Sequence, residues 1–403
     1  MPSTDCPCLR GFLAAAQDES DPRYVILWDK LGLGAAPLRV TLPEFLWLEM
    51  FDGERTLRDI QAEAMRQAGG RILPLELFAA LVERLEKALF LDGPSFRARL
   101  ANPIREPSCI GCYKAEPSGL RRQLEGLFTG RAGPGTPLEK KPDGKLRAAL
   151  VPHIDFGRGG ATFAWGFKEI FERTDAALFV IIGTSHYSAQ RYTLTRKHFR
   201  TPLGVVPTDQ AYIDRLVAHY GDGLFDDELA HLPEHSIELE VVLLQYLYEG
   251  RRSIRIVPLV VGSFQDCIAA ECPPESQDDI RRMIDALRKV EAETKEPICY
   301  VISGDLAHIG PKFADPEPVS DELLSHSKNQ DQAILCHAEA ADPAGYFRIV
   351  ADEVDARRIC GLPPTYTLLE AIRPGKGKLL HYDRYVHPKR YESVSFASMA
   401  FYQ

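Results

Sequence analysis

The chain has 403 residues, of which 45% are hydrophobic and 26% are charged, and its formal net charge is −9 at pH 7. This length predicts roughly two or three domains, and the acidic balance argues against a nonspecific nucleic-acid partner, which would favour a basic face. No run approaches the roughly 20 apolar residues of a membrane span, and the first residues lack a signal-peptide pattern, so we expect a cytoplasmic protein that does not bind membranes.

The amino-terminal part predicts a small helical domain. Residues 1–21 show little periodicity and are expected to be flexible, whereas residues 22–95 carry a complete set of elements. These are a strand over Tyr24–Trp28, a helix over Leu42–Phe51, a helix capped by Thr56 and ended by Gly69-Gly70, a leucine-rich helix over Pro74–Leu89, and a short strand over Phe90–Gly93. Three helices with flanking strands favour a winged-helix domain, which a linker over residues 96–104 would follow.

Residues 105–403 predict a larger α/β domain in which strands alternate with helices. We expect strands over Lys145–Leu150, Leu178–Ile182, Tyr192–Arg200, Ile254–Val261, Ile298–Ile302, Lys378–Arg384 and Ser393–Phe401. We expect helices over Gly119–Phe128 (capped by Ser118), Ala161–Phe171, Asp209–Tyr220, His231 onward, Asp278–Ala292, Asp331–Ala341 and Thr365–Ile372. Because the last two strands are expected to be antiparallel, the fold class is α/β with a central mixed sheet flanked by helices.

The cysteines do not form an obvious structural framework. The number is odd, nine, and they are scattered through a large chain, so we expect most to be free. Cys109 and Cys112 have the spacing of a thiol or metal motif, but a structural zinc site would need a second such pair. We interpret these two as incidental or weakly redox-active thiols.

Polar side chains follow three of the predicted strands. His153 comes after the first, His186 after the second, and Asp305 with His308 after the strand over Ile298–Ile302. A single histidine at a strand end is more often structural, but side chains at the carboxyl ends of strands in one α/β sheet converge where ligands bind. Imidazole is a good ligand for iron, copper and zinc, so this pattern predicts a metal site. Asp305 would ligate the metal or orient a ligating imidazole.

A second pair of polar residues begins a predicted helix. His235 and Glu238 are three residues apart and therefore share a helix face. They suit an acid/base or substrate-binding pair, or else a pair that satisfies backbone donors at the start of the helix.

Eight short motifs then identify a family. They are Pro152–Asp155, Gly183–His186, Thr201–Gly204, Glu234–Glu238, Val257–Gly262, Ser303–His308, Cys360-Gly361 and Ser393–Ser395. Their order resembles that in Memo-like proteins, which include protein B of the AmmeMemoRadiSam system, and the resemblance covers about residues 105 to 403. The family in turn resembles class III extradiol dioxygenases, which are non-haem iron enzymes.

The resemblance implies a metal pocket lined by His153, His186 and His308, with Asp305 and His235 nearby. Animal Memo proteins have a pocket cysteine seven residues before the Ser-Val-Ser motif, but here that count reaches Val386. We therefore expect the thiol to be missing and the next residue, His387, to replace it. Such a site shifts preference from copper(I) toward iron or zinc.

Together these observations predict a metal-dependent oxidoreductase. His153, His186 and either His387 or Asp305 would hold a divalent metal, with iron(II) as the first choice and copper or zinc as alternatives. His235 or His308 would transfer a proton, assisted by Asp305. Asp155, Ser185 and Glu238 would contact a small-molecule or peptide substrate. Asp155 stands where the family has a small Ala-Gly pair.

The amino-terminal domain carries a second resemblance. The run Met50–Ile60, the leucine helix and Phe90–Asp92 resemble PqqD-like domains, which bind peptides in radical-SAM modification systems. This resemblance implies that the domain binds peptides, or else that it is a docking appendage. Together with the resemblance to protein B of the AmmeMemoRadiSam system, it implies a radical-SAM protein and an AMMECR-like protein as partners. The rival function is a non-catalytic peptide- or phosphopeptide-binding protein that uses the same pocket.

Overall fold

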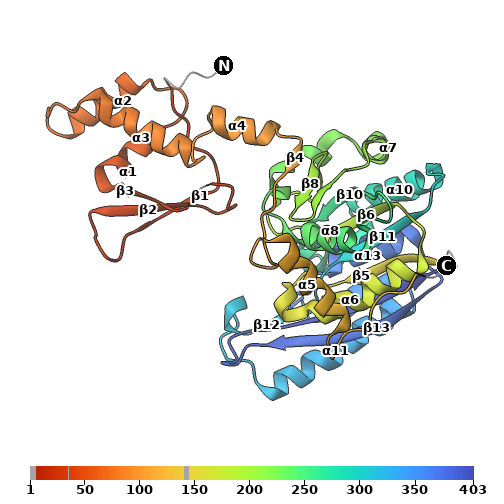
Figure 1. The fold of residues 1–403 in the computed structure, drawn as a ribbon. Helices are drawn as coiled ribbons and strands as arrows, with labels where there is room; N and C mark the ends of the chain where they lie inside the picture. The colour runs from red at the N-terminus through yellow and green to blue at the C-terminus, as the bar shows by residue number, and fades with distance from the viewer. Residues whose placement is uncertain (1–5, 35, 140–144) are drawn as a thin grey trace. The chain divides into compact units, whose positions relative to one another are not determined.

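The computed structural model describes residues 6–34, 36–139 and 145–403. The chain divides into two compact units, Met1–Pro103 and Ile104–Gln403 (Figure 1). No helix in the described residues is long and apolar enough to cross a membrane.

The first unit combines a small sheet with four helices. Its antiparallel sheet has the order β1 (Leu13–Gln17), β2 (Tyr24–Asp29) and β3 (Leu38–Thr41), and its helices are α1 (Leu42–Leu48), α2 (Leu57–Gln67), α3 (Leu75–Lys87) and α4 (Pro94–Ala101). Thr56 caps α2 as expected, in a reciprocal capping box with Asp59. The buried side chains of α2 and α3, among them Ile60, Phe78 and Leu85, pack in one core.

Three expectations about this unit were wrong for the residues that the structure describes, and the part of the first expectation that concerns residues 1–5 lies outside them. Residues 6–21 do not lack structure, because β1 pairs with β2 along its whole length and Arg10 forms a buried ion pair with Asp29 at 2.5 Å. The segment expected to be a linker contains α4, whose Phe96 is buried. Both segments are short on apolar periodicity; the pairing with β2 orders β1, and the burial of Phe96 holds α4. The expected strand at Phe90–Gly93 is reduced to one bridge between Leu91 and Leu9.

The second unit is built on an eight-stranded mixed sheet, so the predicted fold class is confirmed. The strand order is β12-β14-β5-β11-β6-β10-β7, and β13 pairs with the long strand β14. The strands are β5 (Leu146–Val151), β6 (Leu178–Thr184), β7 (Tyr192–Leu194), β10 (Arg255–Val261), β11 (Ile298–Ser303), β12 (His308–Ile309), β13 (Lys376–Val386) and β14 (Ser393–Tyr402). The central four, β5, β11, β6 and β10, are parallel, and β14 runs antiparallel to β5.

Helices cover both faces of this sheet. They are α5 (Pro117–Thr129), α6 (Phe156–Arg173), α7 (Gln210–Tyr220), α8 (His235–Tyr248), α9 (Gln265–Ala269), α10 (Asp278–Glu293), α11 (Asp321–Glu339), α12 (Pro343–Asp352) and α13 (Leu362–Ile372). Successive side chains of a strand point to opposite faces of the sheet, so each strand contributes to two hydrophobic cores. Ala149 and Val151 of β5 pack in the core with α5, α6 and α8, whereas Ala148 and Leu150 pack in the core with α10 and α13. The result is three layers, helix, sheet and helix (Figure 1).

The structure differs from the sequence expectations in several elements. The single edge strand expected over Tyr192–Arg200 is two strands in different sheets, since β8 (His198–Thr201) pairs with β4 (Ile104–Arg105) and β9 (Gly204–Val206). Helix α11 starts at Asp321, where Ser320 caps it, ten residues before its expected start. Helix α5 is capped by Glu116 rather than Ser118. Short 3-10 turns link several of the elements, at Asp222–Phe225, Glu228–His231, Pro274–Ser276 and Pro311–Phe313.

Candidate metal centre

The candidate site lies where three neighbouring parallel strands end. Ser303, the last residue of β11, is level with Val151 of β5 on one side and with Gly183 of β6 on the other. The residues just beyond these ends are His153, His186 and Asp305. The carboxyl ends of parallel strands share one edge of a sheet, so this register explains why side chains distant in sequence meet.

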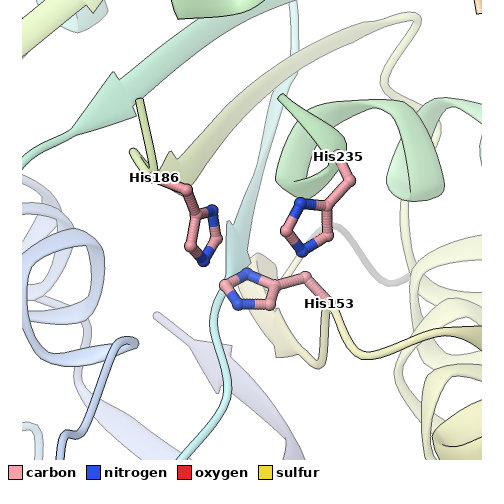
Figure 2. Close-up of side chains that lie close together, drawn as sticks. All are labelled: His153, His186 and His235. Carbon is pink, nitrogen blue, oxygen red and sulfur yellow. The ribbon is translucent and has the colours of Figure 1, made fainter. Parts of the chain in front are cut away.

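Three imidazoles converge at this edge (Figure 2). The ring centroids of His153 and His186 are 5.1 Å apart, those of His153 and His235 are 5.3 Å apart, and those of His186 and His235 are 4.6 Å apart. His235 is the first residue of α8. The cluster therefore combines two histidines that follow strands with one that begins a helix. One nitrogen from each ring lies within 4.8 Å of the other two, which is compatible with one shared metal ion.

Glu234 holds two of these rings in place. Its side chain is almost fully buried; it accepts a hydrogen bond from the backbone N–H of His186 at 2.8 Å, and its Oε1 lies 2.9 Å from His186 Nδ1. The same oxygen lies 3.4 Å from Nδ1 of His235. A carboxylate on one ring nitrogen fixes the ring and leaves the other nitrogen free to ligate. The sequence reasoning assigned no role to Glu234, although an acidic residue directly before a helix-starting histidine is a usable signal.

The charges around Glu234 shift the pKa values of the whole group. Burial opposes ionisation of Glu234, but the pKa of its carboxyl is lowered overall by His186 and His235. Desolvation opposes protonation of His186, yet the charge of Glu234 raises the pKa of that imidazole. Burial lowers the pKa of His235 to about 4. His235 is therefore a neutral imidazole at neutral pH, which is the form that binds metals.

His153 is the most enclosed ring of the cluster. Its backbone N–H donates to Asp305 Oδ1 at 3.0 Å, and its Nε2 lies 3.8 Å from Asp305 Oδ2. Burial and the two neighbouring histidines lower its pKa well below the usual value. Its buried Nδ1 has no hydrogen-bond partner within the part of the chain that the structure describes, so a donor atom remains unused. Burial also raises the pKa of Asp305, to about 7.

A thiol is present after all, and it comes from Cys360. Its Sγ lies 3.2 Å from His153 Nε2, and these two residues with Asp305 form a second group of potential ligands within 4.8 Å. Burial raises the pKa of this thiol well above the usual value. Counting back from Ser393 placed the expected cysteine position in the hairpin between β13 and β14, whereas the thiol comes from the loop before α13. Cys360-Gly361 was nevertheless among the family motifs.

His387 is not part of the cluster, so this expectation is corrected. It lies in the turn between β13 and β14, where its backbone N–H donates to Glu392 O at 2.9 Å and its Nδ1 accepts from Lys389 N at 3.2 Å. Its ring packs 6.3 Å from that of Tyr391. The last pair of the long hairpin joins Val386 to Ser393. His387 is therefore the first residue of the hairpin turn and does not line the pocket.

Glu238 is also placed differently from the expectation. It is fully buried and forms an ion pair with Arg105, while the Tyr113 hydroxyl donates to its other oxygen. Burial opposes its ionisation, but Arg105 and Tyr113 lower its pKa. With Ser108 N–H donating to it at 2.9 Å, Glu238 is occupied within the protein and does not face a substrate.

The remaining predicted residues lie around the cluster. His308 and Asp155 line the same pocket of about 560 Å³ as the three histidines. His308 Nδ1 lies 3.1 Å from the carbonyls of Leu306 and Arg358, and burial lowers its pKa to about 4. Asp155 caps α6 and pairs with Arg158. Ser185 lines a neighbouring pocket of about 250 Å³, which Cys360 also borders.

Comparison with known proteins agrees with this arrangement. The Memo-like protein family matches residues 105–400. A MEMO1 family protein of Aquifex aeolicus is 26% identical over 377 residues, which cover 90% of this chain and 92% of the relative. One from Methanopyrus kandleri is 29% identical over 287 residues, covering 69% of this chain and 91% of the relative. The crystal structure of an uncharacterised Escherichia coli K12 protein aligns with 63% of this chain and 99% of its own length, at 14% sequence identity. Its TM-score of 0.37 is too low to show a common fold. Since the family match spans most of the chain and includes all the residues of the candidate site, the chain belongs to the Memo-like protein family.

Proposed function

We propose that the second unit binds a transition-metal ion and is a metal-dependent oxidoreductase. The observation that carries the proposal is the convergence of nitrogens from His153, His186 and His235 within 4.8 Å of one another. The unused Nδ1 of buried His153 and the carboxylate of Glu234 behind the other two rings support it further. Buried polar atoms are normally satisfied, and a bound cation would give these imidazoles a common partner.

The donor set suggests which ions to test. Three imidazoles with the Asp305 carboxylate beside them suit iron(II), which is our first candidate. The thiol of Cys360 adds a soft donor next to His153, and soft thiolates favour copper(I) or zinc. We therefore infer that Asp305 and Cys360 determine which of these ions binds. Substituting each of these two residues and measuring the bound metal separates iron(II) from copper(I) and zinc.

The pocket around the cluster supports redox chemistry on a bound organic substrate. An iron ion with open coordination positions would supply oxygen activation, as in the dioxygenases that the family resembles. His308 borders the pocket as a neutral imidazole, so it can accept a proton from a substrate hydroxyl, and Asp305 can hold one. Asp155 and Arg158 lie on the wall and can position polar groups of the substrate.

Metal analysis of anaerobically purified protein tests the proposal. We expect one transition-metal ion per chain in the wild type, and its loss in His153→Ala and His186→Ala with circular dichroism unchanged. His387→Ala is the matched control, because it removes a histidine that lies in the hairpin turn, and it should retain the metal. An oxygen-consumption screen with catechols then tests activity. Full metal occupancy in His153→Ala would contradict the proposal.

A second candidate function is the binding of a peptide or phosphopeptide in the same pocket. Two cationic side chains favour it, since Arg158 and Lys312 both line the pocket. Both already pair with Glu392, at 3.4 Å and 2.6 Å, so a phosphate would have to compete with that carboxylate. Binding of a phosphopeptide to chelator-treated protein, lost in Lys312→Ala, would support this candidate.

The partners proposed for the chain rest on its resemblances. The PqqD-like pattern of the first unit supports peptide binding there, and the family resemblance supports association with a radical-SAM protein and an AMMECR-like protein. Co-purification of tagged full-length chain with each of these two proteins tests the association, and the absence of both from the eluate would contradict it.

A further inference from the structure

Cys109 and Cys112 lie in a tight turn on the wall of the histidine pocket. The backbone N–H of Cys112 donates to the carbonyl of Cys109 at 3.0 Å, which is the hydrogen bond of a four-residue β-turn. Such a turn brings its first and last Cα atoms within about 7 Å, close to the range that a disulfide spans. Gly111 has a φ of +117°, a conformation that glycine adopts without strain.

Buried contacts hold this turn in place. The backbone N–H groups of Ser108 and Cys109 donate to Glu238 at 2.9 Å and 3.3 Å, and the ion pair with Arg105 anchors that carboxylate. On the other side, the N–H of Phe156 donates to the carbonyl of Cys112 at 3.3 Å. A turn fixed at both ends keeps the two thiols together without further ordering of the chain.

The two thiols are not equivalent. Cys109 is 9% exposed, whereas Cys112 is more accessible from the pocket. A hydrogen bond between them lowers the pKa of Cys112 and, with burial, raises the pKa of Cys109. An accessible sulfur supported by a buried partner is the usual arrangement of an attacking and a resolving cysteine.

We propose that Cys109 and Cys112 form a thiol–disulfide exchange site that reacts with low-molecular-weight disulfides. Cys112 loses its proton to solvent, and its thiolate attacks one sulfur of the disulfide to form a mixed disulfide; the original S–S bond breaks and releases one thiolate, which takes up a proton. Cys109 then loses its proton to solvent and attacks the Cys112 sulfur, so the mixed S–S bond breaks and releases a second thiolate, which also takes up a proton. Two protein S–H groups are oxidised to one S–S bond, and the two electrons reduce the small disulfide to two thiols.

The test uses the full-length chain with Cys336→Ser, which removes an exposed thiol that would otherwise compete. Chelator is present and oxygen is excluded, so that neither a metal nor air can oxidise the thiols, and the outcome does not depend on the proposed metal. The protein is equilibrated with defined ratios of reduced and oxidised glutathione, quenched with acid, alkylated and mapped by peptide mass. We expect a Cys109–Cys112 disulfide, seen as loss of two hydrogens and loss of both alkylation sites, that dithiothreitol reverses.

Two variants separate the roles of the thiols. In Cys109→Ser the reaction should stop at a glutathione adduct on Cys112, and in Cys112→Ser the buried Cys109 should acquire no adduct. Complete alkylation of both cysteines at every glutathione ratio would overturn the proposal. An adduct on Cys109 in the Cys112→Ser variant would overturn the assignment of Cys112 as the attacking sulfur.

Discussion

Glu240, on the helix that His235 begins, is a carboxylic acid buried in an apolar core. Its carboxyl group lies near Ser303 and in the field of Asp305, and burial raises its pKa well above the usual value. Neither carboxyl oxygen has a hydrogen-bond partner of normal geometry among the residues described. Glu240 is therefore protonated in the folded protein at a pH where it ionises in the unfolded chain.

This difference predicts a pH-dependent gain in stability for Glu240→Gln. Above the unfolded pKa of about 4.3, the folded wild type binds one more proton than the unfolded chain, so its stability falls by up to about 1.4 kcal/mol per pH unit until the folded pKa is reached. The variant lacks this loss. Urea unfolding at about pH 5 and about pH 8 should show its advantage growing with pH. Glu249→Gln, exposed at the end of the same helix, should show little such trend.

The ion pair between Arg105 and Glu238 predicts a large energetic effect of a single substitution. Both side chains are fully buried, so Arg105→Met leaves an uncompensated charge and should lower the free energy of unfolding by about 3–5 kcal/mol. The double variant Arg105→Met, Glu238→Leu should recover much of this loss. Arg97→Met breaks an exposed pair with Asp92 and should cost less than about 1 kcal/mol. Equal losses in the two single variants, measured by denaturant unfolding, would contradict the prediction.

At the scale of single residues, sequence reasoning worked where position along a strand determined the outcome. His153, His186 and Asp305 directly follow apolar runs, and the parallel register brings them together. It did not work for Cys360 and His387, because which loop reaches the pocket depends on tertiary packing. The Cys360 loop is held by contacts such as the Thr184 hydroxyl donating to the Cys360 carbonyl at 2.7 Å, which no local pattern encodes.

Among the elements, the loops after β11 and before α13 meet through two glycines. A Cβ on Gly304 would lie 2.5 Å from the Cα of Gly361, closer than any real Cβ contact. Gly304→Ala should therefore push the Cys360 loop outward, lower stability by about 1–3 kcal/mol and weaken metal binding. Gly126→Ala, in α5 with nothing within 4 Å of the added carbon, is the control and should stabilise by up to about 1 kcal/mol. Unchanged stability in Gly304→Ala would contradict this geometry.

The elements predicted best were those with strong apolar periodicity. The strands at the centre of the sheet and the helices α7 and α10 matched closely, because their buried faces repeat at the period of the element. The edge segment over Tyr192–Arg200 was misread, since its alternation is the same whether it forms one strand or two. Its division between β7 and β8 depends on the partners β10 and β4, which lie far away in the sequence.

At the scale of the whole molecule, the two compact units predict where the chain can be cut. A fragment of residues 1–103 should unfold cooperatively when expressed alone, because its core is contained within it. A fragment of residues 22–95 lacks β1 and Arg10, so β2 loses a partner and buried Asp29 loses its cation. It should unfold at a clearly lower urea concentration in a circular dichroism titration. Equal midpoints for the two fragments would show that the first residues contribute nothing.

The position of β11 has a kinetic consequence. This strand lies between β5 and β6, although it follows both of them much later in the chain. The loops that close these pairings are long, and parallel pairings of this kind form slowly. His153 and His186 follow the two strands that β11 separates, so we expect their imidazoles to meet only after β11 has been inserted, late in folding. Metal added to the refolding buffer should therefore leave the folding rate constant unchanged. It should lower the unfolding rate constant, because the metal binds the native state.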